Sequence, residues 1–309
     1  MKSLKARRII GNTIVYIILG ISAIIWVLPI LWLFFQAFAS EIGSSAMTKF
    51  LPSVSFSENG LITGVNMTFD NFLWLFGAGS PPYAAVHSLD GYFLKWMGNT
   101  MIVAVLTTII ATLFVLSTAY ALSRFRFKGR QTLMKLNLVL GMFPGFLGMI
   151  ILYWVMKVIF HLQGSYWALV IIYSAGTGMG FFISKGFFDT ISRSIDEAAM
   201  IDGANRAEIF WNIILPLSKP IVVYTILTSF MAPWGDYITS SYIIGLQNTS
   251  NWTVAIGLYK WATDTTTYQQ TYYTQYAAGS VVVAIPIAVL FICMQNYYVS
   301  GVTGGAVKG

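Results

Sequence analysis

The sequence predicts an all-α integral membrane protein with six transmembrane helices. Three observations support this fold class: the composition, six long apolar segments, and the placement of the basic residues. Hydrophobic residue types make up 57% of the 309 residues and charged residues only 9%, with a mean hydropathy of +0.70. Since a soluble domain carries about a quarter charged residues, we expect the lipid bilayer to be the solvent of this chain.

A helix that crosses the bilayer needs about 20 mostly apolar residues. Six segments meet this requirement: residues 10–38, 97–122, 133–160, 166–187, 220–246 and 276–299. The first follows the basic start MKSLKARR and is too long for a signal-peptide core, so we interpret it as an uncleaved membrane helix. The fourth is the weakest, because it is rich in glycine and ends at Lys185. Without it, five helices would place the two termini on opposite sides.

Lysine and arginine indicate the orientation, because they are enriched in cytoplasmic loops. Six helices with a cytoplasmic N-terminus leave only four basic residues outside and all the others of the 18 inside. The four are Lys49, Lys95, Lys157 and Lys260. This bias favours six helices and places both termini in the cytoplasm.

The helix positions divide the chain into three parts. Residues 1–95 hold the first membrane helix and an extracellular loop, in which FDNFLWLF (69–76) predicts a short interfacial helix. Residues 96–300 form a five-helix core with a cytoplasmic loop at 192–216, and residues 301–309 are a tail. The aromatic residues of the outer segment 247–275 are typical of membrane-interface anchors, with reception of a substrate or partner as the alternative.

Several smaller features carry weaker predictions. Pro144 and Gly145 are expected to kink the third helix, and Gly176 and Gly180 have the GxxxG spacing typical of close helix packing. The single cysteine, Cys293, excludes an intrachain disulfide. The two histidines stand far apart in the sequence, so no metal site is predicted.

The stretch EAAMIDGANRAEIFWNIILP, from Glu197 to Pro216, is unusually polar for this chain. Ser194 and Glu197 have the spacing of a helix capping box, and Asn205 and Glu208 repeat it. Gly203 can adopt the left-handed conformation that ends a helix, and Pro216 is expected to end the second one. Two short helices joined by a glycine turn suit docking into a groove of another protein.

The next membrane helix is expected to begin directly afterwards, at SKP (218–220). The hydroxyl of Ser218 can cap the helix, and Pro220 is tolerated in the first turn because its missing N–H would be unpaired there.

The same stretch resembles the EAA loop of ABC importer permeases that depend on a binding protein. The spacing is Glu-Ala-Ala, three residues, Gly, nine residues, Ile, one residue, Leu-Pro. The corresponding residues are Glu197, Ala198, Ala199, Gly203, Ile213, Leu215 and Pro216, with Asp202 and Ala204 beside the glycine. The carbohydrate-uptake branch of this family is similar to the chain at residues 98–130 and at APWGDYI (232–238). The terminal GVTGGAVKG resembles the C-terminal tail of the maltose-transporter membrane subunit with six helices. Gly235 interrupts the Trp-Asn/Asp signature here. The resemblance covers about residues 95–309.

The resemblance implies an ABC type I importer permease (MetI-like) core in a bacterial plasma membrane. Such a subunit is not an enzyme and binds no cofactor itself; ATP and Mg2+ belong to a partner ATPase. The implied partners are a second homologous permease subunit, an ATPase dimer, an extracellular sugar-binding protein, and a sugar or oligosaccharide of maltodextrin type, with no nucleic acid. The subunit would form half of a translocation path that alternates its access between the two sides.

The resemblance also implies roles for named residues. The loop around Glu197 and Gly203 would insert into a cleft on the ATPase, with Glu197 paired to a basic residue there. The alternative is that Glu197 only completes its own capping box. The tail, with Thr303, Gly304, Gly305 and Lys308, would reach between the ATPase subunits. The alternative is a disordered chain end.

Asp236 is the clearest ionisable residue within a predicted span, and such residues are functional candidates by default. It lies roughly 25 Å along the helix from Lys219 at 1.5 Å per residue, and Pro233 and Gly235 are expected to break the helix there. A carboxylate beside the rings of Trp234 and Tyr237 could bind a sugar, so these three residues form a candidate translocation path. The alternative is a helix-stabilising aspartate that binds a neighbouring chain.

Two other functions were weighed against transport driven by ATP. An ion-coupled secondary transporter is expected to show internal repeats and several buried charges, and a membrane enzyme needs a polar catalytic constellation. The sequence has neither. No lysine directly follows a glycine, so the GxxxxGK[ST] phosphate loop is absent and ATP hydrolysis must belong to another chain. The sequence does not identify the sugar, the ATPase or the binding protein.

Overall fold

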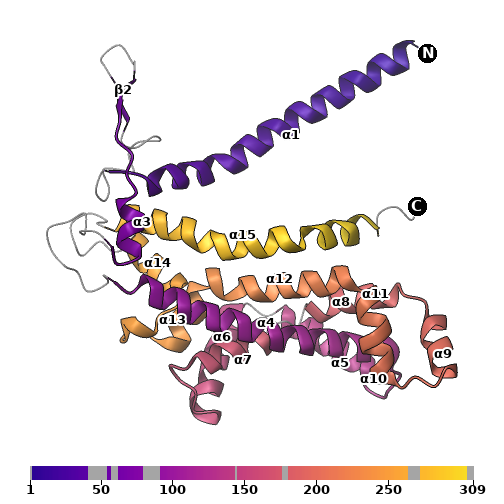
Figure 1. The fold of residues 1–309 in the computed structure, drawn as a ribbon. Helices are drawn as coiled ribbons and strands as arrows, with labels where there is room; N and C mark the ends of the chain where they lie inside the picture. The colour runs from indigo at the N-terminus through magenta and orange to yellow at the C-terminus, as the bar shows by residue number, and fades with distance from the viewer. Residues whose placement is uncertain are drawn as a thin grey trace. The chain divides into compact units, whose positions relative to one another are not determined.

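The computed structural model describes residues 2–40, 54–56, 62–78, 91–142, 145–175, 180–263 and 272–304. The described chain is mostly helical (Figure 1). It divides into two compact units. Unit 1 comprises Met1–Gly91 and Leu258–Val282, and unit 2 comprises Tyr92–Gly257 and Val283–Gly309.

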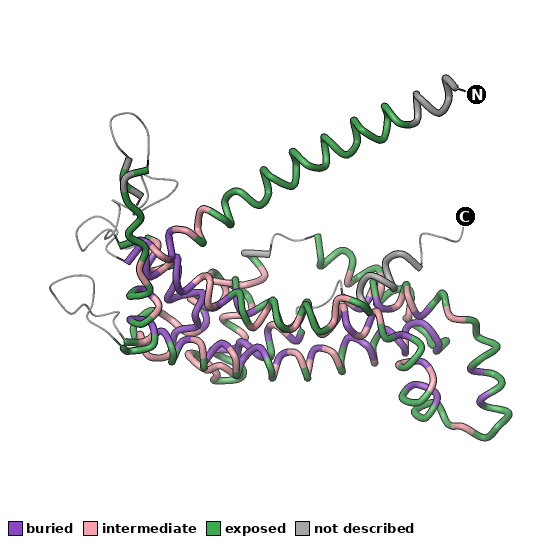
Figure 2. Tube along the Cα trace, turned by 45° about the horizontal axis from the view of Figure 1, so that its top comes forward, coloured by how far each residue is buried: buried purple, intermediate pink, exposed green. Residues whose placement is uncertain are grey.

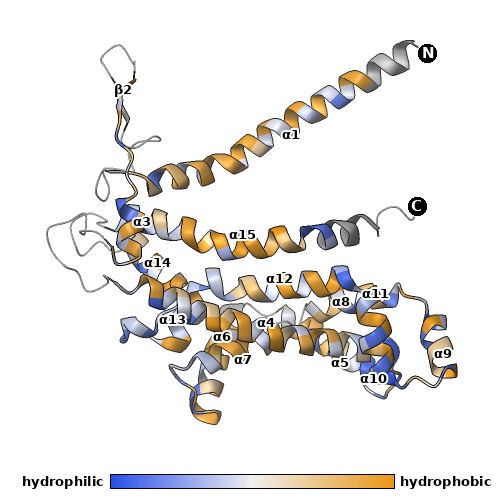
Figure 3. Cartoon of the chain, viewed as in Figure 1, coloured by the Kyte–Doolittle hydropathy of each residue, from blue (hydrophilic) through white to orange (hydrophobic). Residues whose placement is uncertain are grey.

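Unit 1 begins with α1 (Lys2–Ala37), which contains the 29-residue apolar stretch Ile9–Ala37. Hydrophobic residues make up most of this helix (Figure 3), and most of the large ones are exposed, Trp26 by 77%. A helix that is apolar all round suits a lipid environment. The strands β1 (Val54–Phe56) and β2 (Ile62–Val65) pair antiparallel.

The end of α1 is held by α3 (Asp70–Leu75) through hydrogen bonds. The Asn71 side-chain amide donates to the carbonyls of Ala37 (3.1 Å) and Ala39 (2.9 Å). The amide of Gln275, near the start of α15 (Tyr273–Gly304), donates to Asn71 Oδ1 at 3.1 Å. These groups are buried, so the carbonyls that end α1 obtain partners inside unit 1.

Unit 2 is built around α4 (Phe93–Arg124), whose buried residues run along its length (Figure 2). It packs against α7 (Tyr166–Ala175), α8 (Gly180–Asp189) and α12 (Lys219–Gly235). The remaining elements of unit 2 are α5 (Arg130–Gly141), α6 (Gly145–Trp154), η1 (Val155–Ile159), α9 (Arg193–Ile201), α10 (Arg206–Ile209), η2 (Phe210–Ile214), α11 (Leu215–Leu217), α13 (Tyr237–Ile244) and η3 (Thr249–Asn251). Helix α14 (Val254–Thr263) begins in unit 2 and continues into unit 1 from Leu258.

Three of the predicted spans are confirmed as continuous apolar helices: Ile9–Ala37, Phe93–Arg124 and Tyr273–Tyr297. The described part of the chain holds up to five spans if two bent helix pairs are each counted as one; these pairs are Tyr166–Ala175 with Gly180–Asp189, and Arg206–Leu217 with Lys219–Gly235. The predicted fourth span is divided into α7 and α8, and the predicted fifth into α12 and α13.

The predicted third span, residues 133–160, is not one apolar helix among the described residues. It is divided into α5, α6 and η1, and its apolar part Leu147–Ile159 is short for a bilayer. The predicted kink residue Pro144 lies outside the described residues, as does Gly176 of the predicted packing motif. The count of six spans therefore stays a prediction.

The predicted membrane anchors of residues 247–275 are wrong for three large rings in the described part of this segment. Trp252, Trp261 and Tyr272 are 5%, 0% and 1% exposed. Within unit 2, Trp252 stacks on Trp96 at 5.7 Å. Within unit 1, Trp261 stacks on Tyr272 at 5.9 Å. Packing between rings stabilises each unit from within. A ring that is buried in this way cannot also lie at the membrane surface as an anchor.

The start of α12 lies where the sequence predicts it, with Ser218 at the N-cap position and Pro220 in the first turn. The predicted hydroxyl cap is wrong, because the Ser218 side chain is buried and makes no capping hydrogen bond. Its backbone carbonyl accepts instead from Ile221 N (3.0 Å) and Val222 N (3.1 Å).

Candidate functional site

Residues 192–217 form an elbow that projects at one end of unit 2 (Figures 1 and 2). Its first arm is α9, and its second arm is the helical run Arg206–Leu217, which meets α12 at an angle of 86°. Gly203 between the arms has a φ of +89°, as predicted, which is a conformation that suits glycine. The chain turns back there because Ala204 N donates to Ala199 O at 2.9 Å.

The second arm begins with the predicted capping box. Asn205 Oδ1 accepts from the backbone N–H groups of Ala207 and Glu208, both at 3.0 Å, and Glu208 Oε2 accepts from Asn205 N at 2.8 Å. The arm continues through the π-helical turn η2 and ends at Leu217, one residue beyond the predicted end at Pro216.

The predicted capping box at the start of α9 is wrong. The N-cap is Ser192, whose hydroxyl accepts from Ser194 N at 3.3 Å, and the helix begins at Arg193. Arg193 and Asp196 lie one turn apart and both bind the end of α4, which fixes the first turn of α9. Glu197 is exposed and makes no hydrogen bond or ion pair with the described residues, so it does not cap its own helix.

The motif residues separate into an exposed set and a packed set. Glu197, Ala198, Asp202 and Gly203 are exposed, and Ile201 beside them is 86% exposed. The packed residues are Ala199, Ala204, Ile213 and Leu215, which contact a core that includes Phe188, Ile209 and Ile214. Pro216 is exposed. The packed set holds the elbow in place, and the exposed set forms a surface, which we call the docking face (Glu197, Ala198, Ile201, Asp202 and Gly203).

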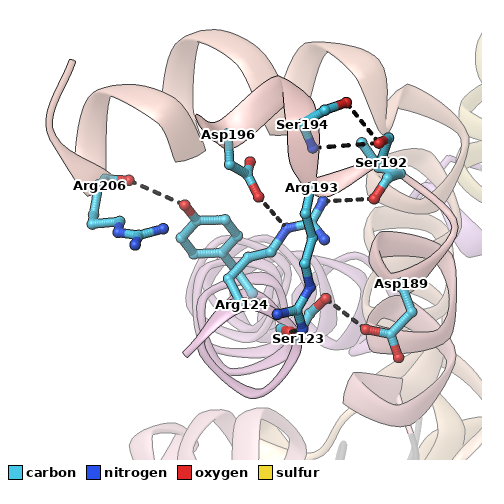
Figure 4. A network of polar contacts seen from close by, with 10 residues as sticks. Ser123, Arg124, Asp189, Ser192, Arg193, Ser194, Asp196 and Arg206 are labelled. Carbon is cyan, nitrogen blue, oxygen red and sulfur yellow. Dashed lines mark hydrogen bonds and ion pairs between the residues drawn. The ribbon is translucent and has the colours of Figure 1, made fainter. Parts of the chain in front are cut away.

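Polar contacts join the elbow to the last turn of α4 (Figure 4). Arg124 Nε lies 2.8 Å from Asp196 Oδ2 in an ion pair whose side chains are only 3% and 4% exposed. Arg124 also donates to Ile191 O at 3.1 Å.

Ser123, the residue before Arg124, contributes two further contacts. Its hydroxyl donates to Asp189 Oδ1 at 2.6 Å, and its carbonyl accepts from Arg193 at 3.1 Å. We call Ser123, Arg124, Asp189, Arg193 and Asp196 the clasp.

Sequence reasoning did not identify the clasp. Arg124 entered only as one of the basic residues that indicate orientation, and Asp196 was not singled out. The sequence did hold one signal. Asp196 lies three residues before Ala199, so both lie on the same face of α9, and both are buried. A buried carboxylate requires a partner, and Arg124, the last residue of α4, is a basic residue that can provide one.

The helix break predicted near Asp236 is confirmed. The backbone leaves the helix at Asp236 (φ −88°, ψ 88°), which separates α12 from α13. One carboxylate oxygen caps α13 by accepting from Thr239 N at 2.9 Å, and the other accepts from the Tyr173 hydroxyl at 3.2 Å. The structure therefore gives Asp236 a helix-stabilising role through contacts within its own chain; contact with a neighbouring chain stays a prediction.

The neighbours of Asp236 differ in access. Trp234 is buried at 4% exposure and packs on Phe230, whereas Asp236 and Tyr237 are half-buried. Of the predicted tail contacts, Gly305 and Lys308 lie outside the described residues; Thr303 and Gly304 belong to the backbone of α15, whose side chains are not described there.

Residues 114–303 match the family model described as the binding-protein-dependent transport system inner membrane component. The chain is similar to the galactooligosaccharides transport system permease protein GanQ of Bacillus subtilis, with 36% identity over the full length of both. It is 32% identical to the maltodextrin transport system permease protein MalD of Streptococcus pneumoniae over 99% of each chain. A solved bacterial ABC transporter, involved in import of the acidic polysaccharide alginate, contains a chain with the same fold, at 22% identity and a TM-score of 0.71, covering 94% of this chain and 96% of that one.

Proposed function

Because the chain belongs to the family of binding-protein-dependent transport system inner membrane components, we propose that it is the permease subunit of an ATP-driven importer of sugars or oligosaccharides. It is a multi-pass membrane protein. The relatives that it matches along its whole length are named for the transport of galactooligosaccharides and maltodextrins, and these short glucose and galactose polymers are the proposed substrate class.

The observation that carries the coupling part of this proposal is the docking face of the elbow. Ile201, which is 86% exposed, lies on this face beside the small Ala198 and the Glu197 carboxylate, which has no partner among the described residues. Apolar residues at the centre of an interface with charge at its rim are typical of protein docking sites. The face lies on the first arm and the turn that follows it, and both arms are capped at their starts and packed at their bases, so the face is presented rigidly.

In this proposal the docking face inserts into a cleft of a partner ATPase, which binds ATP and Mg2+, and this chain hydrolyses nothing itself. Ala198 allows close approach, and Glu197 pairs with a basic residue of the ATPase. The elbow and both termini lie in the cytoplasm. The tail residues Thr303, Gly304, Gly305 and Lys308 extend toward the ATPase subunits.

The proposed translocation path passes the break between α12 and α13, and a second homologous permease subunit supplies its other half. An extracellular sugar-binding protein delivers the substrate. A carboxylate has about four acceptor positions, so Asp236 retains capacity for sugar hydroxyls beside the bonds to Thr239 and Tyr173. Tyr237 is half-buried and offers a ring next to it, whereas Trp234 is buried and supports the break from behind.

The proposal is tested by expressing the chain with an ATPase, a second permease subunit and a sugar-binding protein from its source organism, and by reconstituting the complex in vesicles. We expect uptake of maltotriose or galactotriose that requires ATP on the cytoplasmic side and the binding protein on the other. Uptake without ATP that follows an ion gradient would contradict the proposal and favour a secondary transporter.

Substitutions on the docking face provide the sharper test. Since Glu197 and Ile201 are exposed and Glu197 has no partner in the described chain, Glu197→Lys and Ile201→Asp should leave membrane insertion intact. We expect each to weaken ATPase binding about tenfold or more, as for residues that dominate an interface.

The matched control is Ala207→Lys, which adds a charge to an exposed position of the elbow outside the docking face. Co-purification of the ATPase with the detergent-solubilised permease measures the effect. If both docking-face variants retain the ATPase as well as the control does, the elbow is not the docking site.

A further inference from the structure

The docking face and the clasp lie on neighbouring sides of the same helix, α9. Asp196 is buried against α4, and Glu197, one residue later and therefore about 100° further round the helix, is exposed on the docking face. The chain thus places its buried ion pair one residue from the surface that we propose to meet the ATPase.

The clasp fixes one short segment at several separate points. The last turn of α4 contacts Asp189 at the end of α8, the backbone of Ile191, and Asp196 in α9. Arg193 in α9 also donates a hydrogen bond to the backbone carbonyl of Ser123 in α4. A buried ion pair is costly to desolvate, and packed apolar residues often stabilise a fold equally well. The charged groups add geometric specificity, because hydrogen bonds to charged groups restrict the relative position and orientation of the groups they join.

The clasp joins the elbow to α4, the central helix of unit 2. Helix α4 packs against α7, α8 and α12, so a shift of its last turn would also displace these three helices. The apolar contacts of the elbow, such as Tyr120 with Phe210 (ring centroids 4.8 Å apart), also touch α4, but they constrain sliding and rotation less than directional bonds do.

We propose that the clasp is the mechanical joint through which displacement of the elbow moves α4, with Arg124 and Asp196 as its positioning residues. This inference rests on the proposed function. The joint acts when ATP-driven movement of the ATPase pushes the docking face. The polar contacts keep α9 and α4 in register, so that the push shifts α4 and does not merely tilt the elbow.

Two variants separate positioning from stability. Asp196→Asn keeps the shape of the side chain but leaves the buried Arg124 guanidinium without its counter-charge. The double variant Arg124→Met with Asp196→Leu removes both charges and keeps apolar volume, a replacement that folds well in other proteins. Lys185→Met is the control, because it removes the more exposed ion pair with Asp189 and leaves the Ser123–Asp189 bond in place.

The measurement is the amount of maltotriose or galactotriose imported per ATP hydrolysed, in vesicles that hold the complete transporter. We expect both clasp variants to retain the ATPase and to hydrolyse ATP, while sugar imported per ATP falls about tenfold, within the usual range of coupling between sites. Lys185→Met should retain the wild-type ratio. A purely structural role would lower transport and hydrolysis together, in proportion to the assembled complex.

The outcomes separate this inference from the proposed function. If the wild-type chain neither retains an ATPase nor imports sugar, the proposed function is wrong and the joint has nothing to transmit. If the wild-type works and the double variant imports as much sugar per ATP as the wild-type does, the proposed function stands and the joint is overturned.

Discussion

The contact between Trp96 and Gly257 leaves no space for another atom. A Cβ at Gly257 would lie 2.0 Å from Cε3 of the Trp96 ring. The ring is 0% exposed, and its Nε1 donates to Thr249 O at 2.7 Å. Both the packing and the hydrogen bond prevent the ring from moving aside, so this glycine is required for its lack of a side chain.

We therefore expect Gly257→Ala to lower the free energy of unfolding by about 1–3 kcal/mol, the usual cost of overpacking a core. Gly98→Ala is the matched control, because Gly98 lies in the helix that carries Trp96 and a Cβ there meets nothing within 4 Å. Thermal unfolding of the purified permease in detergent measures both. Equal melting temperatures for the two variants would contradict the expected clash.

Individual residues of the elbow were only partly predictable from the sequence. The left-handed Gly203 and the Asn205–Glu208 box depend on local spacing, and both are confirmed. Ser192 and Ser194 are both suitable caps by residue type, and spacing favoured Ser194. The choice of Ser192 depends on Arg193 and Asp196 binding α4, which is a contact across 70 residues or more that local spacing cannot show.

At the scale of elements, the break between α12 and α13 depends on one carboxylate. Asp236→Ala removes the cap of α13 and the acceptor of the Tyr173 hydroxyl. We expect a loss of about 1 kcal/mol or more in stability, as for other N-caps. Asp236→Asn keeps an oxygen that can accept from Thr239 N, so it should unfold close to the wild-type temperature.

Transport assays on the same two variants separate the break from the sugar. If Asp236 binds substrate hydroxyls as proposed, Asp236→Asn raises the sugar concentration for half-maximal uptake while stability is nearly unchanged. An unaltered half-maximal concentration in Asp236→Asn would leave the residue with its structural role alone.

Long apolar elements were predictable from hydropathy, whereas the division of the predicted fourth span into α7 and α8 was not. The length of α4 follows from an apolar run without proline, and α15 remains one helix although Pro286 lies inside it. The predicted spans that contain glycine or proline pairs are divided into shorter helices, because such residues weaken or end helices. The burial of Trp252 and Trp261 could not be predicted from the sequence either, since residue type alone does not distinguish a ring that faces lipid from one that faces another ring.

At the scale of the whole molecule, the proposed orientation makes a direct prediction for thiol labelling. The single cysteine, Cys293, is exposed and is first replaced by alanine. Gln163→Cys and Ala207→Cys then place one thiol each at exposed positions that the topology assigns to opposite sides.

We expect a membrane-impermeant maleimide to label Gln163→Cys in intact cells and to label Ala207→Cys only after the membrane is opened. The physical reason is the bias of basic residues toward the cytoplasm. Labelling of Ala207→Cys in intact cells would reverse the orientation and remove the elbow from reach of a cytoplasmic ATPase.

The hydrogen bond between Asn71 and Gln275 has a consequence for biogenesis, because it joins groups 204 residues apart in one buried cluster. At about 5–20 residues per second, a ribosome needs about 10–40 s to make the chain between them, a span of 204 residues. During that interval α1 is already in the membrane while Asn71 lacks a partner that it has in the finished protein. Unit 1 therefore stays incomplete until its second segment, Leu258–Val282, is made, and a nascent chain that stalls before Tyr272 carries an unfinished first unit for quality-control proteases to recognise.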